Sequence, residues 1–108
     1  FKLVDIIHMT KTNISKDKLK FINLHKSFFS DLKNTECEIS ETQVHIFESS
    51  GKNPDPASIE LVFKDNHYIL YYWDGYSLAE KDQITSYKDA LSQFKKYAKK
   101  LAKNLRKF

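Results

Sequence analysis

The side chains best suited to chemistry in this sequence are four histidines and one cysteine. His8, His25, His45 and His67 are spread along the chain, and Cys37 is the only thiol. Zinc sites usually take ligands from closely spaced pairs such as HExxH or CxxC, and no two of these five residues stand at such a spacing. His45 and His67 would meet only if their strands were neighbours. The spacing therefore predicts no metal site and no cofactor.

Cys37 is also the residue to consider for nucleophilic catalysis. It lies between Glu36 and Glu38, and neighbouring carboxylates raise the pKa of a thiol and weaken it as a nucleophile. Gly51 and Gly75 fit no GxSxG pattern, so no nucleophile elbow is present. We therefore predict that the protein is not an enzyme. A Cys/His pair that only folding would bring together is the open alternative.

The carboxylates are numerous and scattered, as on a solvated sheet face, which does not indicate acid–base catalysis. In the middle of the chain, however, they stand beside aromatic residues. Aromatic side chains anchor protein interfaces, and charge steers the encounter. We therefore predict a binding site for a basic protein partner, formed by Asp65, Tyr71, Trp73, Asp74, Tyr76 and Glu80. The same aromatics would be core residues if both faces of their strand were covered.

The charges are divided unevenly along the chain. Residues 87–108 carry eight Lys or Arg and one acid, whereas residues 36–82 carry ten acids and three lysines. The basic end is a candidate for binding the phosphates of a nucleic acid, through Lys95, Lys96, Lys99, Lys100, Lys103 and Lys107. The alternative is the ordinary solvent face of an amphipathic helix.

Length and composition favour a single α+β domain over residues 1–108. With one cysteine, no disulfide can form within the chain, which favours a reducing compartment, and we expect a cytoplasmic protein. The longest apolar run, residues 68–73, is too short to cross a bilayer, so no membrane partner is expected. The sequence begins with Phe1 rather than Met, so removal of an N-terminal segment stays an open alternative. Whether the protein is a monomer or a homodimer is left undecided.

Periodicity predicts a helix at each end. Residues 16–33 carry an apolar stripe at helical spacing, with Ser15 as the expected N-cap. From Tyr87 onward a longer stripe faces a lysine-covered side, and Ser86 with Asp89 forms a capping pair. Residues 1–9 fit either a helix or a strand.

Alternating residues predict strands between these helices. One strand is expected within 36–48, a loop at 49–56, and a hairpin of 59–63 with 67–73 around the turn Asp65-Asn66. Asp74-Gly75 is a second turn, and a further strand is expected within 76–84. The fold expected is α+β, with a three- to four-stranded antiparallel sheet packed against an N-terminal helix and a long basic amphipathic C-terminal helix.

Residues 59–94, about a third of the chain, resemble small bacterial immunity proteins, the antidotes encoded beside polymorphic toxins. Several of these families share a strand like Tyr-Ile-Leu-Tyr-Tyr-Trp at 68–73, then a turn, another strand, and a helix that opens like Ser-Tyr-Lys-Asp-Ala-Leu at 86–91. The resemblance implies a stoichiometric inhibitor that masks the active site of a toxin. The acidic middle of the chain would suit a basic toxin such as a nuclease. No site residue carries over, because these families share no motif.

The order helix, strands, helix is also similar to that of double-stranded-RNA-binding domains, and in part to the three-stranded DNA-binding arms of phage integrases. RNA-binding domains of this kind set lysines of the last helix against phosphates. The sequence departs from them because it lacks their Gly-Pro-x-His loop and its lysines lie deep in the helix. We therefore expect an immunity-type protein that binds a toxin, with a small nucleic-acid-binding domain as the alternative.

Overall fold

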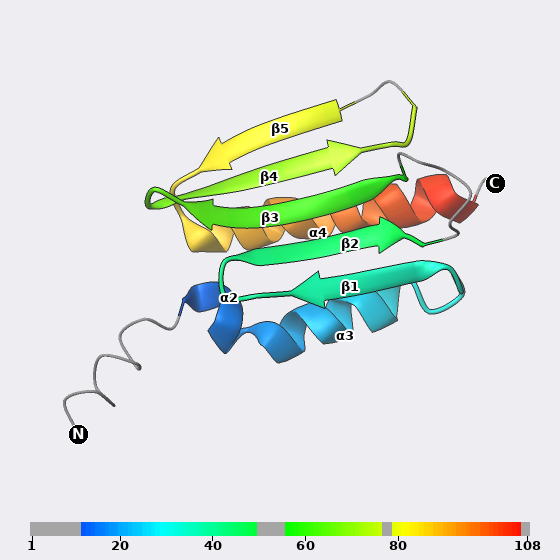
Figure 1. Ribbon diagram of the computed structural model, residues 1–108, viewed down its shortest axis with the longest axis horizontal. Coiled ribbons are helices and arrows are strands. Elements are labelled where there is room, and N and C mark those ends of the chain that lie inside the picture. The colour runs from blue at the N-terminus through cyan, green and yellow to red at the C-terminus, as the bar shows by residue number, and fades with distance from the viewer. Residues whose placement is uncertain (1–11, 50–55, 77–78, 107–108) are drawn as a thin grey trace.

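In the computed structural model, one sheet is packed against helices on one of its faces (Figure 1). The structure describes residues 12–49, 56–76 and 79–106, so the question of residues 1–9 lies outside the described part. The α+β class is confirmed. The elements are α2 (Asn13–Lys16), α3 (Lys18–Phe28), β1 (Thr35–Ile39), β2 (Gln43–Glu48), β3 (Ser58–Lys64), β4 (His67–Trp73), β5 (Ala79–Ile84) and α4 (Tyr87–Arg106).

The five strands form an antiparallel sheet in which each strand pairs with the next one along the chain, in the order β1-β2-β3-β4-β5. This is one strand more than the upper end of the expected range. Residues 36–48 form two strands because Ile39 pairs with Val44 across a tight turn, which the backbone hydrogen bond from Ser40 N to Gln43 O closes. The sequence marks this turn with no glycine or proline, so it was missed.

The predicted hairpin of β3 and β4 is confirmed. Asp65 and Asn66 both adopt positive φ angles, 54° and 63°, as a two-residue type I′ turn requires. Asp and Asn tolerate this left-handed region better than other residues with a side chain. The turn fixes the register, in which Lys64 pairs with His67 and Leu61 with Leu70.

The N-terminal helical segment is broken where one continuous helix was expected. Thr12, not Ser15, caps α2, since its Oγ1 accepts a hydrogen bond from the backbone N–H of Ser15. The chain breaks at Asp17, and α3 ends at Phe28 rather than near residue 33. The Arg106 guanidinium donates to the backbone oxygen of Phe28 at 2.6 Å, which satisfies a carbonyl that no further helical turn would satisfy.

The C-terminal helix forms as predicted. The backbone N–H of Asp89 donates to Oγ of Ser86 at 3.3 Å, which caps the first turn. The apolar stripe of α4 is buried against the sheet, and its members are Ala90, Phe94, Tyr97, Ala98, Leu101 and Ala102. None of the described helices is both long and apolar enough to cross a membrane.

Helices α3 and α4 run parallel on the same side of the sheet. Near their starts, the Tyr87 hydroxyl donates to Oδ2 of Asp17 at 2.7 Å. Near their ends, Arg106 binds both carboxylate oxygens of Asp31 at 2.9 Å. Together the two helices cover one face of the sheet, and the other face is turned toward the viewer in Figure 1.

Candidate functional site

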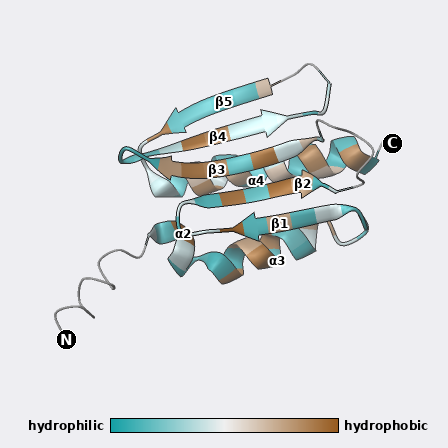
Figure 2. Cartoon of the chain, viewed as in Figure 1, coloured by the Kyte–Doolittle hydropathy of each residue, from teal (hydrophilic) through white to brown (hydrophobic). Residues whose placement is uncertain are grey.

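The face of the sheet opposite the helices carries a group of partly exposed apolar side chains. Along β4, Tyr68, Leu70 and Tyr72 are buried against the helices, whereas Tyr71 and Trp73 point to the other face. This alternation follows from the strand geometry, since successive side chains point to opposite faces. The central strands therefore carry apolar residues on both faces, and Figure 2 shows hydrophobic stretches on them where β1 and β5 are mostly hydrophilic.

Strand register joins these residues into one surface, which we call the open-face patch. Val62 pairs with Ile69 across β3 and β4. Ser58 lies between two aromatic residues, because it pairs with Phe47 on β2 and with Trp73 on β4. The open-face patch consists of Phe47, Val62, Ile69, Tyr71 and Trp73, all at least partly exposed. Aromatic and branched apolar groups in this arrangement are typical of the centre of a protein interface.

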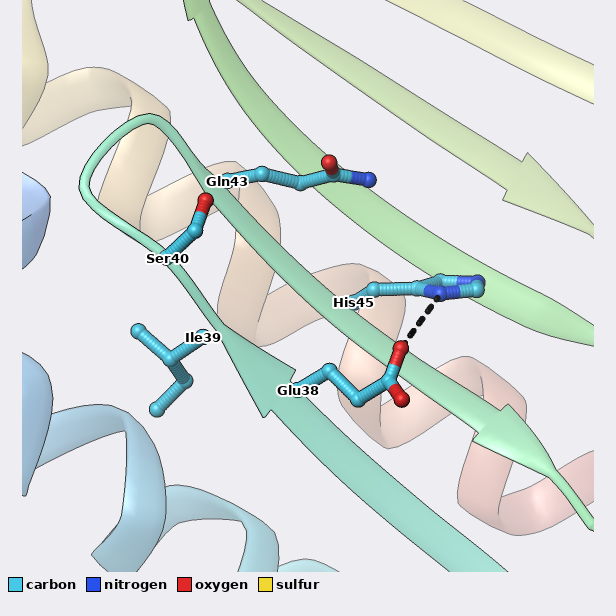
Figure 3. Close-up of a pocket in the computed structure, with 5 residues that line it drawn as sticks. All are labelled: Glu38, Ile39, Ser40, Gln43 and His45. Carbon is cyan, nitrogen blue, oxygen red and sulfur yellow. Dashed lines mark ion pairs between the residues drawn. The ribbon is translucent and has the colours of Figure 1, made fainter.

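Two acidic residues, Glu38 and Glu60, flank His45 on the open face, and we call this pair the acidic row. Figure 3 shows Glu38 of this pair beside the imidazole. The imidazole Nδ1 lies 4.0 Å from Oε1 of Glu38, and Nε2 lies 3.8 Å from Oε1 of Glu60. The Gln43 amide donates to the other oxygen of Glu60 at 2.8 Å, and the imidazole stacks on Phe47 with centroids 4.6 Å apart. These contacts hold the acidic row in place on the sheet.

Two shallow hollows adjoin on this face, and both are bordered by Gln43. The smaller, of about 170 Å³, lies over β1 and β2 between Glu38, Ser40 and His45. The larger, of about 870 Å³, lies over β3, β4 and β5 and contains most of the open-face patch. Its wall on the β5 side is formed by Lys81, whose ammonium lies 5.7 Å from the centre of the Tyr71 ring. The hollows are open, as expected for a surface that receives another macromolecule.

The two layers of the molecule have opposite charge. The described residues of 35–84, which form the sheet layer, contain nine Asp or Glu and two lysines. Residues 12–33 and 87–106, which form the helical layer, contain twelve Lys or Arg and three Asp. The predicted contrast between an acidic middle and a basic tail thus becomes a contrast between two layers, and the N-terminal helices belong to the basic layer. The acids of the sheet layer do not all face the open side, because Glu80 and Asp82 pair with the buried Tyr72 and Leu70 and contact α4.

The structure separates the residues predicted to bind a protein partner. Tyr71 and Trp73 lie together on the open face, as members of its patch. Asp65 lies in the β3–β4 turn, while Asp74 and Tyr76 follow the other end of β4. Tyr76 is 68% exposed, and its backbone N–H is bound by the carboxylate of Asp74.

Glu80 belongs to the opposite face of the sheet. It pairs with Tyr72, whose side chain is buried against the helices, and its carboxylate forms an ion pair with Lys100 of α4. Glu80 is therefore part of the contact between β5 and α4. Successive side chains of a strand point to opposite faces, so knowledge of the register of β4 and β5 would have placed Glu80 and Tyr71 on different faces.

The six lysines of the alternative nucleic-acid site also have different surroundings. Lys100 pairs with Glu80 and lies over the Tyr72 ring. Lys99 lies 5.8 Å above the centre of the Phe28 ring, and Lys95 borders a groove between α3 and α4. Lys96 and Lys103 are exposed on the outer side of α4, and Lys107 lies outside the described residues.

Cys37 faces the helices and packs against the core, while Glu36 and Glu38 point to the open side. Burial, more than the charge of Glu38, raises the pKa of the thiol to about 11, so it stays protonated near neutral pH. The direction agrees with the prediction, but the main cause is burial, which the flanking sequence does not reveal. Among the described residues, no three His, Cys, Asp or Glu side chains are placed to hold a metal ion.

Sequence reasoning missed most of the open face: Glu38, His45, Phe47, Glu60, Val62 and Ile69. The signal that would have found them is the two-residue alternation combined with the hairpin register. Comparison with known proteins adds no further guide to the site, since no protein-family model matches the chain and no match was found among curated proteins or solved structures.

Proposed function

We propose that this chain is a non-catalytic binding protein whose open sheet face receives a basic protein partner. The observation that carries the proposal is the position of the open-face patch beside three carboxylates on the same face of the sheet, Glu36, Glu38 and Glu60. Apolar and aromatic groups at the centre of such a surface provide affinity when they are desolvated. Carboxylates around them raise the association rate with a basic partner and disfavour acidic ones.

The more specific form of the proposal is an immunity-type inhibitor that masks the active site of a toxin. Its supports are the resemblance of residues 59–94 and the carboxylates of Glu36, Glu38 and Glu60 on the open face. A nuclease active site is lined with cations for its phosphate substrate, so an acidic protein surface can compete for the same groups. The reading needs no catalytic group in this chain, in keeping with the raised thiol pKa of Cys37.

The test is to capture a partner from the source organism with the immobilised chain, purify that partner, and measure its affinity for two open-face variants. Tyr71→Ala removes an anchor, and Glu38→Lys reverses one charge of the acidic row. Each should weaken binding by about tenfold or more. The matched control is Asp89→Lys, which makes the same change in charge on the helical layer and should leave the affinity within about twofold.

Two results would overturn this assignment. One is a captured protein whose affinity falls with Asp89→Lys but not with Glu38→Lys or Tyr71→Ala. The other is a captured partner that is not basic. For the inhibitor form, the purified partner should be toxic to cells when expressed alone and harmless when expressed with this chain. Protection should decline in the order of the measured affinities.

Nucleic-acid binding through the helical layer is the alternative, favoured by its twelve Lys or Arg. Lys100 is held by Glu80, so the discriminating variant is Lys96→Glu with Lys103→Glu. Phosphate contacts would give saturable binding of a labelled duplex that falls steeply with salt. Such binding, lost in this variant, would replace the protein-partner proposal if the open-face variants retained full function in cells.

A further inference from the structure

The outer side of the helical layer contains a groove between α3 and α4. Four apolar side chains line it: Phe21, Leu24 and Phe28 from α3, and Leu91 from α4. The volume of the groove is about 420 Å³. The groove arises because the helices touch mainly underneath it, where Phe21 packs edge-on against Phe94 with ring centroids 5.6 Å apart.

Three of the four apolar residues in the groove are only partly covered, and Phe21 is buried. Leu24, Phe28 and Leu91 are half-buried, although each packs against the core on its inner side. Leu19, which also lies on α3, is 68% exposed. Covering apolar surface of this kind stabilises a complex by about 25 cal/mol for each Å² removed from water. The groove therefore favours an occupant with its own apolar side chains.

The borders of the groove are basic. Lys20 on α3 and Lys95 on α4 line its two sides, and Lys99 lies over the Phe28 ring at one end. An occupant must therefore combine apolar groups along its centre with acidic groups on both flanks. A phosphate backbone would match the lysines but would leave the apolar floor uncovered. The basic partner proposed for the sheet face would be repelled here.

We infer that this groove binds an acidic amphipathic helix from a protein partner, separate from the surface on the sheet. An eleven-residue helix such as α3 is about 16 Å long, or about three turns. It is therefore long enough to lie along a bound helix whose apolar residues at i, i+3, i+4 and i+7 span about two turns. Glutamates on both flanks of that stripe would reach Lys20 and Lys95. The molecule would then have two docking surfaces of opposite charge preference, one on each layer.

The test uses a fluorescein-labelled synthetic helix with leucines at i, i+3, i+4 and i+7 and glutamates on both flanks. We expect saturable binding to the whole chain in low salt with a Kd of about 10–100 µM. Lys20→Gln with Lys95→Gln should weaken it by about tenfold. The matched control is Lys64→Gln with Lys81→Gln, which removes the same charge from the sheet layer and should change the Kd by less than about twofold.

A second variant addresses the apolar floor. Leu91→Ala should weaken the peptide by about fivefold or more while circular dichroism shows the fold retained. The inference is overturned if the peptide does not bind, if a scrambled peptide of the same composition binds equally well, or if the two lysine pairs have equal effects. It is also overturned if a labelled DNA duplex binds with the same dependence on Lys20 and Lys95 and displaces the peptide, since the groove would then be a phosphate site.

Discussion

The two faces of the sheet are built from the same strands but differ in how completely their side chains are covered. On the helix side, Ile46, Leu61 and Tyr72 are fully buried among apolar neighbours. On the open side, Val62 lies between Glu60 and Lys64 along β3, and Tyr71 pairs with Glu60 and Lys81 on the neighbouring strands. Both remain partly exposed. One face therefore stabilises the fold, and the other provides apolar surface that the fold itself does not use. This difference is the physical basis for assigning the open face to binding.

The largest expected effect separates the two faces by stability. Phe94 is fully buried and packs against Phe21, so Phe94→Ala should lower the free energy of unfolding by about 3–5 kcal/mol. Tyr71→Ala on the open face, where the ring is 37% exposed, should lower it by about 1 kcal/mol or less. Urea denaturation of both variants measures the contrast. Equal losses would mean that the open-face ring supports the fold as much as the core does.

A smaller effect concerns the polar contacts at the margin of the covered face. The Tyr97 hydroxyl donates to Oδ2 of Asp82 at 2.5 Å, and the Gln93 amide donates to the same oxygen at 2.9 Å. Burial and the Asp82 contact raise the pKa of Tyr97 to about 12. Tyr97→Phe should cost about 1–2 kcal/mol of stability, because Asp82 loses one of two donors in a half-buried position. Tyr71→Phe on the open face is the control. A comparable loss of stability in this variant would contradict the difference between the two faces.

The smallest effect is a dependence on pH. Partial burial lowers the pKa of His25, whose Nε2 lies 3.0 Å from Oγ1 of Thr35. Because the unfolded chain then binds a proton more readily, the contribution of His25 to stability is present above the unfolded pKa of about 6.5 and is lost as the pH falls below it. The wild type should therefore lose more stability on acidification than His25→Gln. Urea midpoints at neutral and mildly acidic pH measure this. An identical acid response in His25→Gln and the wild type would show that groups other than His25, such as the carboxylates, account for the whole effect.

The sequence by itself determined the α+β class, the β3–β4 hairpin and α4. Each depends on local chemistry: Asp65 and Asn66 accept the positive φ angles of the turn, Ser86 caps the helix, and α4 carries its apolar residues at helical spacing. The charge contrast was also visible, because it follows the order of residues. The turn at Ser40 and the break at Asp17 were missed, because neither is marked by a glycine or proline in the sequence.

Only the tertiary structure decided which residues share a face. Tyr71 and Glu80 belong to the same acidic and aromatic stretch, yet strand parity places Tyr71 on the open side and Glu80 against Lys100. Register brought Glu38 and Glu60 to His45 from two other strands, and the parallel packing of α3 on α4 created the groove. A shift of one residue in strand pairing would move each of these strand side chains to the other face of the sheet. The register of the strands is set by the turns and by the burial of one face under the helices.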